Sequence, residues 1–215
     1  MSALAIGPLP SARDAAVRRA RRLTWLTIGW NAVEGVVAVT AGIAAGSVSL
    51  VGFGLDSGIE VSAAIILAWR LAAERAGQCS QAVDRRATRA IALSFAALAA
   101  YVLAESARDL ATRAAPEASV PGIALAALSL IVMPLLARAK RRLAPVVGSR
   151  AMVAEASQTV LCSLLSAVLL VGLGLNALAG WWWADPVAGL VIGGLAAVET
   201  VRTWRAESLA DTCCG

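Results

Sequence analysis

Six long stretches of apolar residues limit what this chain can fold into. They lie at roughly 23–45, 50–71, 89–109, 119–137, 152–176 and 181–203. A helix needs about 20 such residues to cross a bilayer. Of the 215 residues, 59% are hydrophobic and 15% are charged, whereas soluble domains average about 45–50% and about 25%. The sequence therefore predicts an all-α membrane protein in which residues 23–205 form a bundle of six transmembrane helices.

Short basic segments separate these stretches and indicate their orientation. Of the 19 Lys and Arg residues, all but Arg108 and Arg113 fall before the first stretch, around the second and fourth links, or after the sixth stretch. Because Lys and Arg concentrate on the cytoplasmic side of membrane proteins, both termini are expected in the cytoplasm. We therefore expect a multi-pass protein of the cell membrane. Residues 1–22 would form a cytoplasmic basic segment and residues 206–215 a short cytoplasmic tail.

Two acidic residues stand out in the second stretch, because charges inside a bilayer are costly and usually functional. Asp56 and Glu60, in the segment GFGLDSGIEV, are four residues apart. Residues with this spacing share one face of a helix, about 5–6 Å from each other. Their negative charges would repel each other in an empty site, and a bound cation would relieve that repulsion. The pair therefore predicts a cation site.

The fifth stretch offers a complementary row of ligands. In AEASQTVLCSLLS, Glu155, Gln158 and Cys162 fall at i, i+3 and i+7, which places them on one stripe of a helix. In an antiparallel pair of helices, Glu60 and Cys162 reach the same depth, roughly 15 Å from the helix ends. Cys162 also fits the alternative of a small buried apolar residue, and Gln158 that of an interhelical hydrogen bond. Glu155 lies nearer the cytoplasm, where it would line an entrance.

Two segments resemble the cation diffusion facilitator family. WNAVEGVVAVTAGIAAGSVSLVGFGLDSGIEVSAA, residues 30–64, resembles spans one and two of that family. AEASQTVLCSLLSAVLLVGLGLNALAGWWWADPVAGLVIGG, residues 154–194, resembles spans five and six, including the Asp-Pro that opens span six. The resemblance is weaker in the third and fourth stretches. It is closest to short, divergent members that lack the cytoplasmic metal-binding domain and are similar to transmembrane zinc transporters.

This resemblance implies six transmembrane helices, a homodimer, and export of a divalent metal in exchange for protons, with no resident cofactor. The family's site joins an Asp-x-x-x-Asp pair in span two to a His-x-x-x-Asp or Asp-x-x-x-Asp pair in span five. The first pair maps onto Asp56 and Glu60, and the second onto Gln158 and Cys162. Carboxylates with a thiolate suit zinc and similar transition metals. Further candidates, for the entrance or for proton coupling, are Glu155, Glu34, Asn31 and Asp185.

Other classes of function fit the same residues. One is a membrane protein that binds metal or a partner without transporting it. Another is an exporter of small lipophilic cations that uses Asp56 or Glu60 as the counter-charge. An intramembrane enzyme has little support, because neither His-Glu-x-x-His nor Gly-x-Ser-x-Gly occurs. The pair Cys213 and Cys214 either collects metal near the cytoplasmic mouth or is a reduced tail, and we favour the tail.

Overall fold

The computed structural model describes residues 10–75, 81–147 and 150–205, with side chains at 15–16, 18–65, 89–146, 156 and 158–205. These ranges form α1 (Pro10–Ala45), α2 (Val48–Arg75), α3 (Gln81–Thr112), α4 (Val120–Val147), α5 (Arg150–Ala179) and α6 (Ala184–Arg205). Each helix contains a segment long and apolar enough to cross a membrane, which confirms the predicted fold. The helices extend beyond the apolar stretches, because Ala and Arg at their ends are good helix formers.

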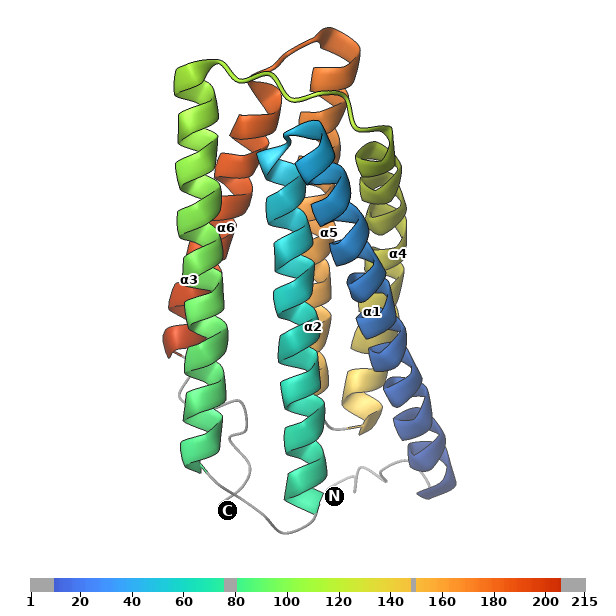
Figure 1. Ribbon diagram of the computed structural model, residues 1–215. Helices are drawn as coiled ribbons and strands as arrows, with labels where there is room; N and C mark the ends of the chain where they lie inside the picture. The colour runs from blue at the N-terminus through green and yellow to red at the C-terminus, as the bar shows by residue number, and fades with distance from the viewer. Residues whose placement is uncertain (1–9, 76–80, 148–149, 206–215) are drawn as a thin grey trace, which may run out of the picture.

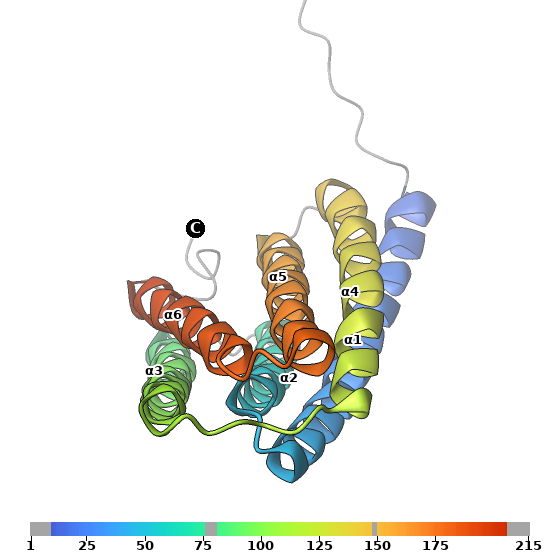
Figure 2. The same cartoon turned by 90° about the horizontal axis from the view of Figure 1, so that it is seen from above.

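Successive helices run in opposite directions, so the bundle has two distinct ends (Figure 1). At the end that we call the basic end, α1 begins and α6 ends, close to Arg18 and Arg202. At the other end, called the turn end, Gly46 and Gly180 follow α1 and α5 with φ of +65°. Glycine adopts this left-handed conformation without a steric penalty. The link at 113–119 crosses the turn end from α3 to α4 (Figure 2).

α2 and α5 lie in the middle of the bundle (Figure 2). α1 packs along α2 and α4, while α4 also packs along α5. On the opposite side α3 packs along α6, and α6 contacts both central helices. The central helices carry the predicted acid pair and the predicted thiol. The helix order therefore places these groups in the interior rather than on the lipid-facing surface.

Apolar packing surrounds this interior. Phe53, Met133 and Leu169 are fully buried and share one core with Cys162. A second core, which includes Phe95 and Val102, joins α3 to α2 and α6. Apolar side chains therefore surround the polar groups between α2 and α5.

Small residues allow the helices to approach closely at defined points. A Cβ atom added to Gly172 of α5 would lie 2.6 Å from Cβ of Ala188 and 3.2 Å from the carbonyl oxygen of Ala184, both in α6. A Cβ atom at Gly42 of α1 would lie 2.8 Å from the backbone nitrogen of Val51 in α2. Atoms this rigid cannot move aside, so glycine is required by contact at these two places.

We expect Gly172→Ala to lower the stability of the folded bundle. The added methyl group overpacks the contact between α5 and α6, at a cost of about 1–3 kcal/mol, against a gain in helix propensity of up to about 1 kcal/mol. Gly174→Ala is the matched control, because an added Cβ there meets no atom within 4 Å. Unfolding of both variants in detergent, followed by circular dichroism, checks this. A Gly172→Ala protein as stable as Gly174→Ala would contradict the packing of α5 on α6.

Candidate metal centre

The acid pair of α2 and the thiol of α5 come together inside the bundle. One carboxylate oxygen each from Asp56 and Glu60, and Sγ of Cys162, lie within 4.8 Å of one another. Asp56 is 6% exposed and Cys162 is fully buried, while Glu60 is partly buried. We call these three residues the acid–thiol cluster. Two carboxylates and a thiol at this spacing can ligate a single transition-metal ion.

Asn31 of α1 forms one wall of the cluster. Its Nδ2 donates a hydrogen bond of 2.7 Å to Oε2 of Glu60, which fixes the orientation of that carboxylate. Asn31 is only 2% exposed, and its Oδ1 has no hydrogen-bond partner among the described residues. The sequence marked this residue as a candidate for the entrance or for proton coupling. The structure places it directly beside a predicted ligand.

Glu34 is a third acid next to the cluster, and four side chains donate hydrogen bonds to it. Trp30 Nε1 and the hydroxyl of Ser129 donate to its Oε2 at 2.5 and 2.6 Å. The hydroxyl of Ser57 and the thiol of Cys162 donate to its Oε1 at 3.0 and 3.8 Å. The donors belong to α1, α4, α2 and α5, and Glu34 itself is fully buried. This acid therefore joins four helices, and its part in proton coupling stays a prediction.

A small cavity of about 150 Å³ adjoins the cluster on the side of the basic end. In α2, Glu60 lies one turn closer to that end than Asp56, and in α5, Gln158 lies one turn closer than Cys162. The residues lining this inner cavity include Thr27, Asn31, Glu60, Lys140, Gln158, Thr159 and Thr203. Gln158 thus faces the same space as Glu60, and its role as a ligand stays a prediction.

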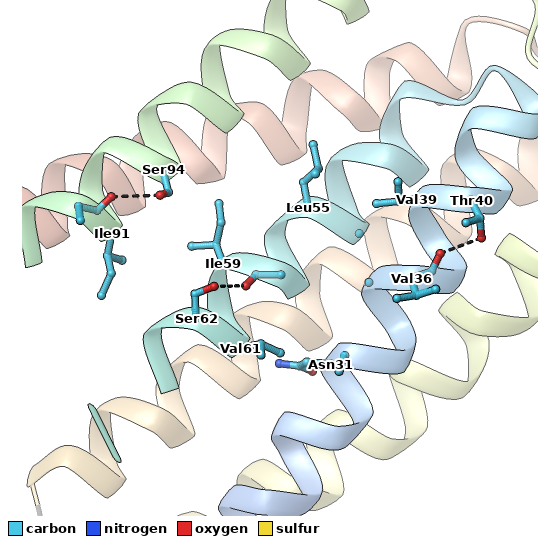
Figure 3. A pocket seen from close by; sticks show the side chains of 15 residues that line it. Asn31, Val36, Val39, Thr40, Leu55, Ile59, Val61, Ser62, Ile91 and Ser94 are labelled. Carbon is cyan, nitrogen blue, oxygen red and sulfur yellow. Dashed lines mark hydrogen bonds between the residues drawn. The ribbon is translucent and has the colours of Figure 1, made fainter. Parts of the chain in front are cut away.

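A wider groove of about 630 Å³ opens between α1, α2 and α3 (Figure 3). Most of its lining is apolar, and the hydroxyls of Thr40 and Ser62 donate to backbone carbonyls of their own helices at 2.7 and 2.9 Å. Asn31, Val61 and Ile91 line both this groove and the inner cavity. The groove therefore passes close to Glu60 while offering few free polar groups of its own.

Other residues marked by the sequence lie apart from the cluster or outside the described residues. Asp185 is fully buried at the start of α6, where its Oδ1 accepts hydrogen bonds from the hydroxyls of Ser47, at 2.6 Å, and Ser49. These contacts tie α6 to the beginning of α2 at the turn end, away from the acid–thiol cluster. The side chain of Glu155, and all of Cys213 and Cys214, lie outside the described residues.

Sequence reasoning missed the polar residues that α4 contributes. Ser129 donates to Glu34, and Lys140 donates to the Thr159 hydroxyl at 3.3 Å. Both are fully buried, in line with Met133 and Ala137 of the same helix. The spacing of Ser129, Met133, Ala137 and Lys140 follows the helical period. This helical period was the signal that could have identified the buried face of α4. The basic residues around Lys140 instead suggested only the cytoplasmic end of a membrane span.

We expect Glu34→Ala to destabilise the protein by about 2–4 kcal/mol, because it leaves the donors of half-buried Trp30 and buried Ser129 without an acceptor. Glu105→Ala is the matched control: Glu105 forms an exposed pair with Arg108 at 3.1 Å, and such pairs contribute little. Chemical denaturation of the purified variants measures the difference. Equal stabilities would show that the Glu34 hydrogen bonds do not hold the four helices together.

Comparison with known proteins identifies the family to which the chain belongs. Residues 86–209, more than half of the chain, match the cation efflux transmembrane domain. Transmembrane protein 163 of Xenopus laevis is 25% identical over 177 residues, which cover 82% of this chain and 63% of that protein. The chain thus spans less than two thirds of the length of this relative. The chain is a multi-pass membrane protein and belongs to the cation efflux family, the cation diffusion facilitators, whose members transport cations and are not enzymes.

Proposed function

We propose that this protein exports a divalent transition metal, zinc in the first place, in exchange for protons. The observation that carries the proposal is the acid–thiol cluster, in which Asp56, Glu60 and Cys162 present ligand atoms within 4.8 Å of one another. Membership of a cation-transporting family supports the same conclusion. The metal is the transported substrate in this proposal, and the protein needs no resident cofactor.

The chemistry of the cluster favours zinc and similar metals over magnesium or calcium. Hard cations prefer sites made of oxygen atoms alone, whereas sulfur ligands favour zinc and its neighbours. Zinc most often takes four ligands. We assign the fourth position to the side-chain oxygen of Gln158, which faces the inner cavity together with Glu60.

Proton exchange follows from the same ligands. A metal ion binds the deprotonated forms of carboxyl and thiol groups, so its binding releases protons and protonation releases the ion. The sequence contains no histidine. The groups that exchange protons would therefore be Asp56, Glu60 and Cys162, with Glu155 and Glu34 as neighbouring acids.

The proposal also includes the orientation of the protein in the membrane and its oligomeric state. With the basic end in the cytoplasm, as the distribution of Lys and Arg favours, the inner cavity is the path from the cytoplasm to the cluster. Export across the cell membrane then ends at the turn end, where Glu105 and Asp109 line a cavity of about 540 Å³. We further propose a homodimer, as the family resemblance implies.

A second candidate function is export of small lipophilic cations. The observation that favours it is the apolar groove between α1, α2 and α3, which shares Asn31 with the inner cavity and so approaches Glu60. An apolar cation could reach the acids from the lipid through this groove. Competition between zinc and tetraphenylphosphonium in one transport assay separates the two candidates, because only the second predicts uptake of the organic cation.

We expect Asp56→Ala to abolish zinc transport, because it removes a ligand and one of the charges that compensates the ion. Liposomes that contain the purified protein and are acidic inside should take up external zinc and lose protons. The Asp56→Ala protein should fall to the background of empty liposomes. Glu117→Ala serves as the control, because Glu117 is an exposed acid in the link between α3 and α4.

Different results of this assay would contradict different parts of the proposal. Equal zinc flux by wild type and Asp56→Ala would remove the acid–thiol cluster from the transport path. Zinc uptake that does not respond to the pH gradient would exclude proton exchange. Tight zinc binding with no flux would instead favour a metal-binding protein without transport.

We expect Cys162→Ser to change the metal preference of the site. Replacing sulfur by oxygen removes the ligand that favours soft metals, so cadmium affinity should fall by at least about tenfold, because the loss of a partner outside the coordination shell already costs about 10–100-fold. Manganese, which prefers oxygen ligands, should bind about as well as before and provides the internal control. Calorimetric titration of the purified proteins measures both. Parallel changes for cadmium and manganese would show that Sγ is not a ligand.

A further inference from the structure

A cavity lined by arginines lies between α1 and α4, which pack along each other (Figure 2). Its volume is about 320 Å³, within the range of about 300–1,000 Å³ that is typical of sites for small ligands. We call it the arginine cavity, and it is lined by Arg19, Leu135, Arg138, Ala139, Arg142 and Leu143. None of these residues lines the inner cavity or the apolar groove. The arginine cavity is therefore separate from the acid–thiol cluster.

One face of α4 forms most of the arginine cavity. The lining residues of this helix, from Leu135 to Leu143, fall at i, i+3, i+4, i+7 and i+8, which is the spacing of one helix face. Met133 and Ala137, on the opposite face, are buried in the bundle, whereas Leu135 is 58% exposed. Leu135 also lies farther from the basic end than the two arginines of this face. The cavity thus has an apolar side toward the middle of the membrane span and a charged side toward the basic end.

The packing of α1 on α4 brings a third arginine to the same cavity. Ala20 of α1 packs with Ala144 and Leu143 of α4, which places the preceding Arg19 beside this part of α4. The α4 span of 27 residues is about 40 Å long, whereas the hydrocarbon core of a bilayer is about 30 Å thick. The end of the span that carries Arg142 therefore extends to the level of the lipid headgroups.

The three arginines of the cavity form no ion pair with a carboxylate of the described residues. The ion pairs found there join Arg108 to Glu105 and Arg202 to Glu199, and α4 contains no acidic residue. Three positive charges around one space repel each other. Guanidinium groups form paired, charge-assisted hydrogen bonds with phosphate oxygens. A phosphate group is therefore a ligand that suits both the charge and the donors of the cavity.

We propose that the arginine cavity binds the phosphate of an anionic phospholipid. The phosphate contacts Arg19, Arg138 and Arg142, and an acyl chain follows the exposed side chain of Leu135 toward the bilayer interior. A free phosphate ion would leave this apolar side unused, which favours the lipid. Basic pockets between membrane helices are known to bind anionic lipid headgroups. The bound phosphate joins α1 to α4 and compensates the repulsion between their arginines, whether or not the protein transports zinc.

Lipid binding by the purified full-length protein tests this site. Native mass spectrometry measures the affinity for dioleoylphosphatidylglycerol, which is anionic, and for dioleoylphosphatidylcholine, a zwitterionic lipid with the same acyl chains. We expect wild type to bind the anionic lipid at least about tenfold more tightly than the zwitterionic lipid. Arg19→Gln and Arg142→Gln should each lower the affinity for the anionic lipid about fivefold, the effect expected for one basic residue near anionic lipid.

Two matched controls separate a binding site from a general attraction to anionic membranes. Arg21 and Arg141 are exposed arginines of the same two helices, and neither lines the cavity. Arg21→Gln and Arg141→Gln should stay within about twofold of wild type. If all four variants lose the same affinity, the arginines act only as a diffuse positive surface, and the inference is overturned. Equal binding of the two lipids by wild type overturns it as well.

The same spectra distinguish the other possible occupants of the cavity. Inorganic phosphate in excess should leave the anionic lipid bound, because it lacks the contact with Leu135. Complete displacement of the lipid by inorganic phosphate would show that the site takes the free ion, and the lipid assignment would be wrong. If Arg142→Gln alters the proportion of monomer and dimer but binds phosphatidylglycerol as wild type does, the cavity is an interface between two copies, which also overturns the inference.

Discussion

Three carboxyl groups, those of Glu34, Asp56 and Glu60, lie close together in the interior of a membrane-spanning bundle. The arrangement of the central helices depends on which hydrogen-bond donors each carboxyl group has. Glu34 is satisfied by the protein itself, because donors from four helices surround it. Glu60 receives one hydrogen bond from Asn31. Among the described residues, no side chain donates a hydrogen bond to Asp56, the acid of the α2 pair that lies nearer the turn end. The acids of α2 are therefore the ones that a cation would complete.

This difference in hydrogen bonding distinguishes Glu34, a structural acid, from Asp56 and Glu60, the proposed transport acids. A buried polar group without a partner is unfavourable by several kcal/mol in an apolar environment, and the proposed cation would compensate for the acids of α2. Glu34 fixes the relative positions of α1, α2, α4 and α5, and thereby sets the distance between the carboxylates of α2 and the thiol of α5. Glycine contacts such as that of Gly172 with α6 bring the outer helices close enough to exclude lipid from this interior.

The sequence predicted the six helices and the shared face of Asp56 and Glu60, because both depend on local patterns: apolar length in the first case and the helical period in the second. The proximity of Cys162 to the acids was reasoned from helix depth and family resemblance, and the structure brings these residues together. The hydrogen bonds of Glu34 with Ser57 and Ser129 depend on which faces of α2 and α4 meet, which no local pattern reveals. The burial of Lys140 could not be predicted for a similar reason, since a basic residue among other basic residues is normally exposed.

The charges of the ligands bear on how a deeply buried site would exchange its ion in the proposed function. Two carboxylates neutralise a divalent ion, and a thiolate in addition would leave the occupied site negative and the ion tightly held. A transporter needs affinity high enough to capture its ion and low enough to release it, and in the proposed exchange the deprotonated ligands of the cluster supply the first requirement and their protonation supplies the second.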